Sequence, residues 1–367
     1  MAIESIKIVF TLVIIVQFLF LFIVFLPLPK AAHKNTHFRS TKLDWPDISI
    51  VLIVKNEHAN LTELIPILLQ LEYKGHFDIH ILDDASTDGT LEYIIQKFNT
   101  NKKVHLHVST NGVSVGKKKR LLDLAGIETY ALLLFTDADC RPEPRWLDSM
   151  AMKADHNQIV LGFSPYYEDS NPINKLIQFE TGLTALMYMG LANIGLAYMG
   201  VGRNILYTKS TLVSSVNLKK YKEVLSGDDD LTVNELRNKH TPGINLEPES
   251  FVYSIPKTAA AAWIAQKQRH ASTAKYYNVS DQVILFSFYS TYVAWWVCVI
   301  FLLLIDFRLA IFGLVMKVIW YILFRYLNRK IFKYVFTWNK MISADLMYAY
   351  FLVYLLPAAT IKKIRQW

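Results

Sequence analysis

An uncharged apolar segment near the N-terminus, residues 8–26, sets the first limit on how this chain can fold. A helix of about 20 apolar residues is long enough to cross the hydrocarbon core of a bilayer. We therefore expect a transmembrane helix here. A cleaved signal peptide is the alternative, but its apolar region would be shorter, about 7–15 residues, and a cleavage site of small residues would follow it.

The C-terminal part of the chain is apolar again. Residues 283–305 predict a second membrane span and residues 309–324 a shorter one, with Asp306 and Arg308 in the turn between them. The last apolar stretch, residues 346–359, precedes a basic tail. A full crossing there conflicts with the positive-inside rule, so a re-entrant or interfacial segment is the alternative.

Basic residues set the expected orientation in the membrane. Four of them follow the first apolar segment: Lys30, Lys34, Arg39 and Lys42. Because such residues collect on the cytosolic side, we place the polar middle of the chain in the cytosol. Two cysteines are too few for a disulfide framework, and Cys298 falls inside a predicted membrane span, which is consistent with a reducing, cytosolic face. The formal net charge of +8 is then explained by residues that flank membrane segments and meet anionic lipid, and we expect no nucleic-acid partner.

The middle of the chain alternates between two kinds of pattern. The apolar, β-branched run at residues 48–54 predicts a buried parallel strand, and further strands are expected at residues 77–82, 104–108 and 131–135. Helices are expected between them, at residues 61–71, 90–98 and 117–125. This alternation predicts a three-layer α/β/α sandwich of the Rossmann-like, nucleotide-binding kind, with its ligand site beyond the carboxyl ends of the strands.

Polar motifs follow three of the predicted strands. They are Asn56 and Glu57 after the first strand, Asp83 and Asp84 after the second, and Asp137 and Asp139 after the fourth. Each pair alone would suit a turn or a helix cap. Their convergence on one edge of the sheet favours a nucleotide-binding crevice, in which Asp137 and Asp139 would hold Mg²⁺ or Mn²⁺ against phosphate groups.

These motifs, together with two later ones, resemble the membrane-bound glycosyltransferases of family 2. The most specific is Asp83-Asp84-Ala-Ser86-Thr-Asp88-Gly-Thr90, and the later ones are Gly227-Asp-Asp-Asp230 and Gln266-Lys-Gln-Arg269-His270. The resemblance covers about residues 46–275 and implies a GT-A fold with flanking transmembrane helices. Within the family, the chain looks most like the processive β-glycan synthases and the ceramide glucosyltransferases.

The resemblance implies roles on the donor side of the site. Asp83 and Asp84 would bind the base and ribose of a nucleotide sugar, because carboxylates accept hydrogen bonds from a uracil N–H or a ribose hydroxyl. Asp137 and Asp139 would hold the metal ion that neutralises the diphosphate. Lys117 either approaches the phosphates or lies on a solvated helix face.

The resemblance also places the general base in the acidic motif at residues 227–230. Three consecutive aspartates leave the choice open between Asp228 and Asp229. An acidic N-terminus on the following helix is the alternative, since negative charge there favours the helix dipole. Three adjacent acids exceed what a cap needs, and crowded carboxylates raise one another's pKa towards a useful range.

The resemblance also implies four candidates for binding the acceptor: Gly202, Asn204, Gln266 and Trp263. Arg269 would contact the diphosphate, with lipid headgroup binding as the alternative for a residue beside the membrane. His270 stands where the family usually has Trp. Trp263 lies seven residues earlier on the same face of the predicted helix and is the candidate to replace that aromatic platform.

We therefore expect three regions: an N-terminal transmembrane helix and basic linker at 1–44, a cytosolic GT-A domain at 45–275, and C-terminal membrane or interfacial helices at 276–367. The expected activity is inverting transfer from a nucleotide sugar, with a UDP-sugar favoured, to a glycan at a bacterial inner or plasma membrane, as in a polysaccharide synthase. A lipid acceptor and a non-catalytic synthase subunit are the alternatives. A partner subunit or a second copy would help to complete a polymer channel.

Overall fold

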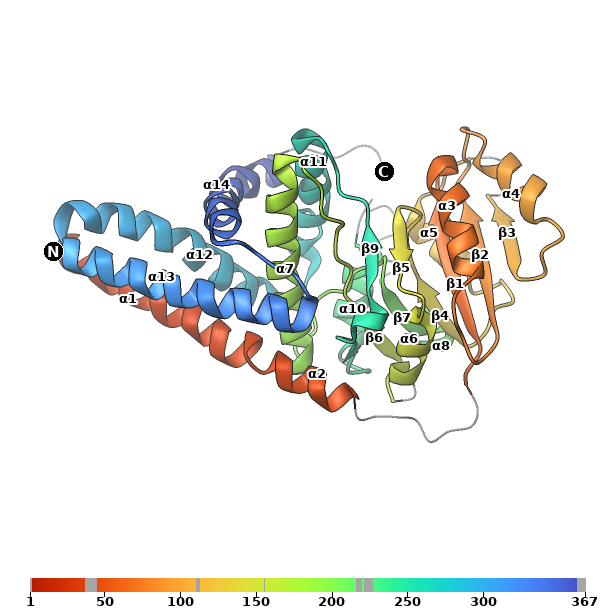
Figure 1. The fold of residues 1–367 in the computed structure, drawn as a ribbon, viewed down its shortest axis with the longest axis horizontal. Helices are drawn as coiled ribbons and strands as arrows, with labels where there is room; N and C mark the ends of the chain where they lie inside the picture. Colours follow the sequence, from red (N-terminus) through yellow and green to blue (C-terminus); the bar gives the residue numbers. More distant parts are fainter. Residues whose placement is uncertain are drawn as a thin grey trace. The chain divides into compact units, whose positions relative to one another are not determined.

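The structure is a computed structural model that describes residues 2–36, 45–109, 113–154, 156–215, 220 and 227–361 (Figure 1). The chain forms two compact units. Among the described residues, the helical unit comprises residues 2–31, 168–194 and 257–361, and the sheet unit comprises those between 32 and 167 and between 195 and 256. The units therefore interleave along the sequence. The three regions predicted from the sequence, 1–44, 45–275 and 276–367, are consecutive instead, and their bounds stay a prediction.

A mixed seven-stranded sheet, in the order β3-β2-β1-β4-β7-β6-β8, forms the centre of the sheet unit. Its strands are β1 (Ile48–Val54), β2 (Phe77–Asp83), β3 (Val104–Val108), β4 (Leu132–Phe135), β6 (Ile159–Leu161), β7 (Ile205–Thr208) and β8 (Gly243–Ile244). The four strands β3, β2, β1 and β4 are parallel, and β7 is antiparallel to β4 and β6. The parallel half is the part that the alternating sequence pattern predicts.

Helices cover both faces of this sheet. They are α3 (His58–Leu69), α4 (Thr90–Phe98), α5 (Lys117–Asp123), α6 (Trp146–Ala154), α8 (Lys209–Val213) and α10 (Asp230–Leu236). On one face, α3 and α6 pack against alternate residues of β1 in a core that includes Ile50, Leu64 and Trp146. Burying a side chain such as Leu64 stabilises the fold by about 1.5–3 kcal/mol. On the other face Leu121 of α5 lies near Phe135. The predicted three-layer sandwich is confirmed.

A second, two-stranded sheet fixes the loop that follows β4. It pairs β5 (Cys140–Pro142) with β9 (Val252–Ser254) in antiparallel register. Asp137 and Asp139 lie between β4 and β5. Because strands hold both ends of this short loop, the two carboxylates have little freedom to move apart.

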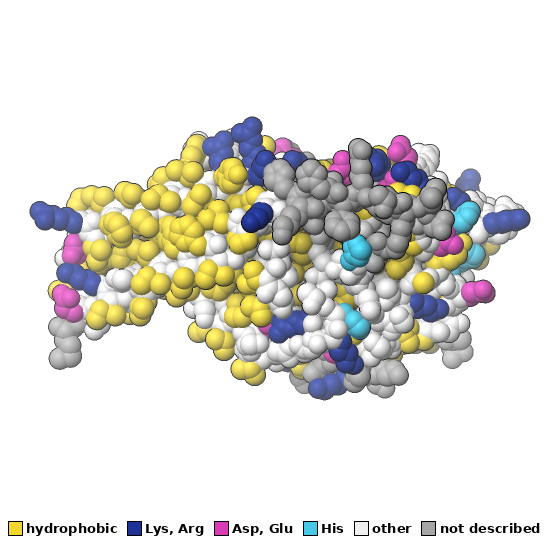
Figure 2. Space-filling model, turned by 90° about the horizontal axis from the view of Figure 1, so that it is seen from below, with side chains coloured by type: hydrophobic (Ala, Val, Ile, Leu, Met, Phe, Trp, Pro, Cys, Tyr) yellow, Lys and Arg dark blue, Asp and Glu magenta, His cyan; other side chains and the backbone are white. Residues whose placement is uncertain are grey.

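Among the described residues, three helices are long and apolar enough to cross a membrane: Ile3–Ala32, Val279–Ile305 and Phe307–Phe332. The first joins α1 (Ala2–Leu19), a π-helical turn (Phe20–Phe25) and the start of α2 (Leu28–Thr36). The other two are α12 (Val279–Ile305) and α13 (Phe307–Leu327), the latter extended by the π-helical turn Asn328–Phe332. Exposed apolar side chains cover α1, α12 and α13, on the left of Figure 2. The spans predicted at 8–26, 283–305 and 309–324 are thus helices suited to a membrane.

The helical unit also contains α7 (Pro172–Asn193), α11 (Ala260–Ala271) and α14 (Trp338–Ile361). The predicted segment 346–359 lies within α14, which is not one of the three spanning candidates. Whether it crosses the membrane, and on which side the sheet unit lies, stay predictions. Several basic residues used for the predicted orientation lie outside the described part of the chain: Arg39, Lys42, Lys362, Lys363 and Arg365.

Candidate active site

The predicted polar motifs lie at one edge of the sheet. In the parallel register Val54 is opposite Asp83, and Val51 is opposite Phe135. The carboxyl ends of β1, β2 and β4 therefore meet at the same edge, as in other open α/β sheets that bind ligands there.

Asp84 shapes the loop before α5. Its side chain is fully buried, and its carboxylate accepts hydrogen bonds from Ser114 Oγ at 2.6 Å, from the Val115 amide at 2.7 Å and from the Gly116 amide at 3.1 Å. Gly116 has a φ of 87°, which a residue with a side chain rarely adopts. This turn starts α5 and positions Lys117, so Asp84 has a structural task in addition to any contact with a nucleotide.

Asp83 is buried beside it and retains acceptor capacity. Its Oδ2 accepts a hydrogen bond from the Ser86 amide at 3.0 Å. Its Oδ1 is buried and has no hydrogen-bond partner among the described residues. An unsatisfied buried carboxylate oxygen is costly, and a ligand N–H or hydroxyl would relieve that cost.

Asn56 and Glu57 join the loop after β1 to the loop after β2. The Asn56 amide donates to Ser86 Oγ at 2.9 Å, and its side-chain Oδ1 accepts from the Thr87 amide at 2.8 Å. The Glu57 amide donates to Thr90 Oγ1 at 3.1 Å. The side chain of Asn56 is thus engaged in holding this edge together.

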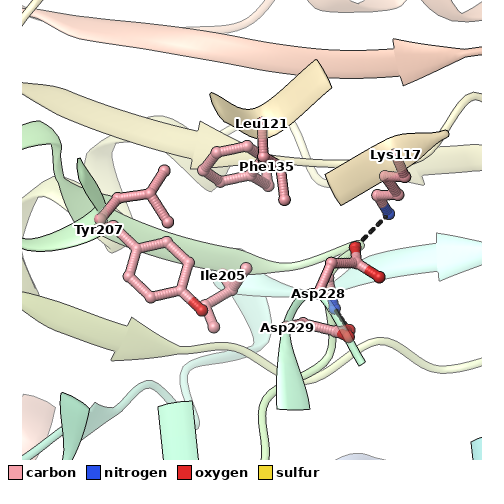
Figure 3. A pocket seen from close by; sticks show the side chains of 9 residues that line it. Lys117, Leu121, Phe135, Ile205, Tyr207, Asp228 and Asp229 are labelled. Atoms are coloured by element: carbon pink, nitrogen blue, oxygen red, sulfur yellow. Dashed lines mark hydrogen bonds and ion pairs between the residues drawn. The ribbon is translucent and has the colours of Figure 1, made fainter. Parts of the chain in front are cut away.

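A lysine and several carboxylates form a cluster at the edge. Lys117 Nζ lies 3.0 Å from Asp137 Oδ1. It lies 3.4 Å from Asp228 Oδ2, the ion pair drawn in Figure 3. Burial alone would lower the pKa of Lys117, but Asp137, Asp228 and Asp229 outweigh that effect and raise it. Lys117 is therefore a permanent cation inside the site, and its side chain does not lie on a solvated helix face.

The pKa of Asp229 lies above the ordinary value of an aspartate. Burial, and then the charge of Asp228, raise the pKa of Asp229 to about 6, against the opposing effects of Lys117 and of hydrogen bonds from the backbone. One of those bonds comes from the Gly202 amide to Asp229 Oδ2. A Cβ on Gly202 would lie 2.8 Å from that same oxygen, so only glycine fits without displacing the carboxylate.

The cluster borders a pocket of about 270 Å³, part of which is open to solvent. Lys117, Asp228 and Asp229 line its polar side, and Leu121, Phe135, Ile205, Tyr207 and Leu212 its apolar side (Figure 3). Apolar walls strengthen the electrostatic effect of the charges beside them. The same walls favour the neutral form of a carboxylate and so raise its pKa above the ordinary value.

Asp137 and Asp139 fit a divalent cation by the chemistry of their donor atoms. The Asp137 side chain is 40% exposed, so an ion could reach it from solvent. Asp139 Oδ1 accepts a hydrogen bond from the Cys140 thiol at 3.6 Å. Burial raises the pKa of that thiol, and the charges of Asp139 and Asp137 raise it further, which indicates a concentrated negative potential. Hard carboxylate oxygens in such a potential suit Mg²⁺ or Mn²⁺.

The loop with Gly202 also contains Asn204, whose predicted role at the acceptor stays a prediction, and Arg203, for which no role was predicted. The amide of Asn204 is buried: its Oδ1 accepts from Trp146 Nε1 at 2.9 Å, and its Nδ2 donates to the Phe163 carbonyl at 2.7 Å. Asn204 thus anchors the loop in this conformation. Arg203, which received no role, stacks over the ring of Tyr166 with 4.4 Å between the guanidinium carbon and the ring centroid.

The remaining predicted residues, Trp263, Gln266 and Arg269, lie on α11 of the helical unit. Trp263 is 1% exposed, and its ring centroid is 4.4 Å from that of Phe351. Gln266 Oε1 is buried without a hydrogen-bond partner in the described part of the chain, and Arg269 Nη2 lies 3.3 Å from His270 Nε2. The roles of these three at a donor or an acceptor stay predictions.

Comparisons with known proteins agree with the fold and the motifs. Residues 49–208 match the family described as glycosyl transferase family 2. Glycosyltransferase AglE of Haloferax volcanii is 27% identical over 107 residues, which are 28% of this chain and 34% of AglE. The chain thus spans about a third of the length of that relative.

Among solved structures, the mannosyltransferase PcManGT from Pyrobaculum calidifontis, in complex with GDP-Man and Mn²⁺, superposes with a TM-score of 0.58 at 14% identity, over 97% of this chain and 100% of that one. S. aureus TarS 1–349 in complex with UDP-GlcNAc has a TM-score of 0.41 at 18% identity, over 68% and 81% of the two chains. With its sheet, its acidic motifs and its family match, the chain carries a glycosyltransferase family 2 domain built on the GT-A fold.

Proposed function

We propose that the protein is a membrane-bound, inverting glycosyltransferase that moves a sugar from a nucleotide sugar, with a UDP-sugar favoured, to an acceptor hydroxyl. The observation that carries this proposal is the pairing, in one pocket, of a carboxylate whose pKa is about 6 with a buried lysine that also holds Asp137. Asp229 would remove the proton from the acceptor hydroxyl, and Lys117 would bind the negative charge of the diphosphate.

On the donor side, Asp83 Oδ1 offers a buried acceptor for a base N–H or a ribose hydroxyl. Lys117 supplies positive charge for the diphosphate next to Asp137. Asp137 and Asp139 would hold Mg²⁺ or Mn²⁺, which would supply Lewis-acid stabilisation of the charge on the nucleoside diphosphate.

On the acceptor side, Asp229 takes the proton of the attacking hydroxyl. The oxygen then forms a bond to the anomeric carbon of the sugar while the bond from that carbon to the diphosphate breaks, so the nucleoside diphosphate leaves and the configuration inverts. The Gly202 amide fixes Asp229 Oδ2, which keeps the base in one orientation during this step. A base with a pKa close to the working pH transfers protons most effectively.

The acceptor is a glycan in our leading proposal and a lipid in the second. Three spanning helices among the described residues favour the lipid, because a polymer channel normally needs more helices unless a partner subunit or a second copy supplies them. The products distinguish the two proposals: a ladder of oligomers indicates a glycan synthase, and one product soluble in organic solvent indicates a glycolipid synthase.

The test is nucleotide release by the detergent-purified protein with UDP-glucose, UDP-GlcNAc, UDP-galactose or GDP-mannose, with and without Mn²⁺ or Mg²⁺. GDP-mannose is included because PcManGT was solved with it. We expect release with one donor, and loss of release in Asp139→Asn and Asp229→Asn while membrane insertion is unchanged. Glu92→Gln, which alters an exposed acid of α4, is the matched control. Full activity of both aspartate variants would refute these assignments, and no release with any donor would favour a non-catalytic subunit.

A further inference from the structure

A cluster of one aspartate and two histidines lies on β2 and β3, apart from the residues discussed so far. Asp78 and His80 are two positions apart on β2, and His105 of β3 is the register partner of His80. Side chains at alternate positions of a strand point to the same face, so the three share one face of the sheet. Asp78 precedes Asp83 by five residues, about 16 Å along the strand. The cluster is therefore near the opposite end of β2 from the nucleotide edge.

The ligand atoms of this cluster are close enough to share one ion. His80 Nε2 lies 3.2 Å and His105 Nε2 lies 3.8 Å from Asp78 Oδ2. One ligand atom from each of the three residues fits within 4.8 Å of the others. Two ligands in a tetrahedral zinc site, each roughly 2.0–2.1 Å from the metal, are about 3.3 Å apart. Small side-chain rotations would thus bring all three atoms to coordination distance.

Buried atoms without partners mark the centre of the cluster. His80 is 2% exposed, and its Nε2 has no hydrogen-bond partner among the described residues, although Asp78 Oδ2 is near. Asp78 Oδ1 is also buried and unpaired there. The ring nitrogen and the carboxylate oxygen Oδ2 thus lie in direct contact at 3.2 Å. An ion bound between them would replace this contact.

The orientation of His80 is fixed from its other side. His80 Nδ1 lies 2.9 Å from His107 Nε2, within hydrogen-bond distance, and the two rings are stacked with an interplanar angle of 6°. A metal-binding histidine usually bonds through its second nitrogen to a neighbouring group, which sets the ring orientation and the tautomer. His107 is in the position for that supporting role.

We propose that Asp78, His80 and His105 bind a divalent transition-metal ion of the Zn²⁺ type. Two imidazoles and one carboxylate are ligands that zinc accepts, and magnesium or calcium would prefer oxygen donors throughout. The His105 side chain is 43% exposed, so the ion can enter from solvent and a water molecule can complete the coordination. Since β3 ends the strand order and pairs only with β2 in this sheet, the ion would fasten an edge strand to its neighbour.

The test uses the full chain, purified in detergent, stripped of metal with a chelator and dialysed against Zn²⁺, with bound zinc counted by mass spectrometry. We expect the wild type to bind a zinc ion that Asp139→Asn retains. His105→Gln should weaken that binding at least about 10-fold, because even loss of a supporting outer partner costs 10–100-fold. The exposed His76, on the loop before β2, supplies the matched control His76→Gln, which should bind zinc like the wild type.

A second measurement guards against misfolding of the variants. Because His105 is half-exposed, His105→Gln is expected to fold, whereas His80→Gln changes a buried residue. Zn²⁺ should raise the thermal unfolding midpoint of the wild type and of His76→Gln, but not that of His105→Gln, since a ligand bound only by the folded state stabilises it. Equal zinc affinity of wild type and His105→Gln, or a zinc site lost only in Asp139→Asn, would overturn the proposal.

Discussion

The pKa of Asp229 leads to a specific pH dependence of sugar transfer. A carboxylate acts as a general base only when it is ionised. With a pKa of about 6 for Asp229, roughly 90% of the enzyme has an active base at pH 7 and roughly 10% at pH 5. We therefore expect kcat/KM to fall about 10-fold between these two pH values, with the midpoint of the acid limb near pH 6.

Two substitutions should move this midpoint in opposite directions. Asp228 is a like charge that raises the pKa of Asp229, so Asp228→Asn should move the midpoint to lower pH. Lys117 lowers the pKa of Asp229, so Lys117→Met should move it to higher pH. A unit charge within about 4–6 Å shifts a pKa by roughly 1–3 units, and we expect about one unit in each direction.

The assay is kcat/KM for nucleotide release, measured from about pH 5 to pH 8 at a saturating metal concentration. Lys117 and Asp228 also contact each other, so both variants are expected to lose activity at every pH. The quantity to compare is therefore the pH midpoint of the acid limb and not the absolute rate. Glu92→Gln removes an exposed acid of α4 and should keep the wild-type midpoint. If the midpoint is the same in all proteins, or moves the same way in both variants, Asp229 is not the titrating base.

Three further results are expected. Gly202→Ala should lower kcat about 100-fold, since the added Cβ would contact Asp229 Oδ2 and displace the base. The control Gly126→Ala, where an added Cβ meets only ordinary contacts, should keep the wild-type kcat. Lys317→Met should lower the stability in detergent, followed by thermal unfolding, by about 3–5 kcal/mol, because it leaves the buried Asp345 without its ion pair at 3.3 Å; an unchanged unfolding midpoint would contradict this. Removal of divalent metal with a chelator should lower nucleotide release on the order of 100-fold, and Mn²⁺ should restore it.

The four parallel strands were the part of the fold that the sequence predicted best. The bounds of β1 and β3 agree with the prediction, and β2 and β4 differ by one residue at one end. β1 and β4 are buried on both faces, so they appear in the sequence as nearly continuous apolar runs. In β2 and in the half-buried β3, polar residues alternate with apolar ones. The short strands β6 and β8 have only three and two residues and carry too little pattern to be separated from the loops around them.

The positions of the acidic motifs could be predicted, but the engagement of individual side chains could not. Strand ends in a parallel sheet fix where Asp83 and Asp137 lie. The loop with Asn204 was assigned to the acceptor by resemblance, yet the amide of Asn204 bonds to Trp146, which is 58 residues away in the sequence. Hydrogen bonds between residues so far apart in the sequence depend on how α6 packs against the sheet. A local sequence pattern cannot predict them.

Lys117 shows how the electrostatics of the site depend on the fold. From the sequence, the Lys117 side chain could be expected either on a solvated helix face or in contact with phosphates. The buried carboxylate of Asp84 holds the amides of Val115 and Gly116, the positive φ of Gly116 starts α5, and the first residue of α5 is Lys117. The lysine then lowers the pKa of Asp229, which burial and Asp228 raise. Asp84, which directly follows β2, thereby influences the pKa of Asp229 through the position of Lys117. A substitution at Asp84 would therefore change the proposed base as well as any contact with a nucleotide.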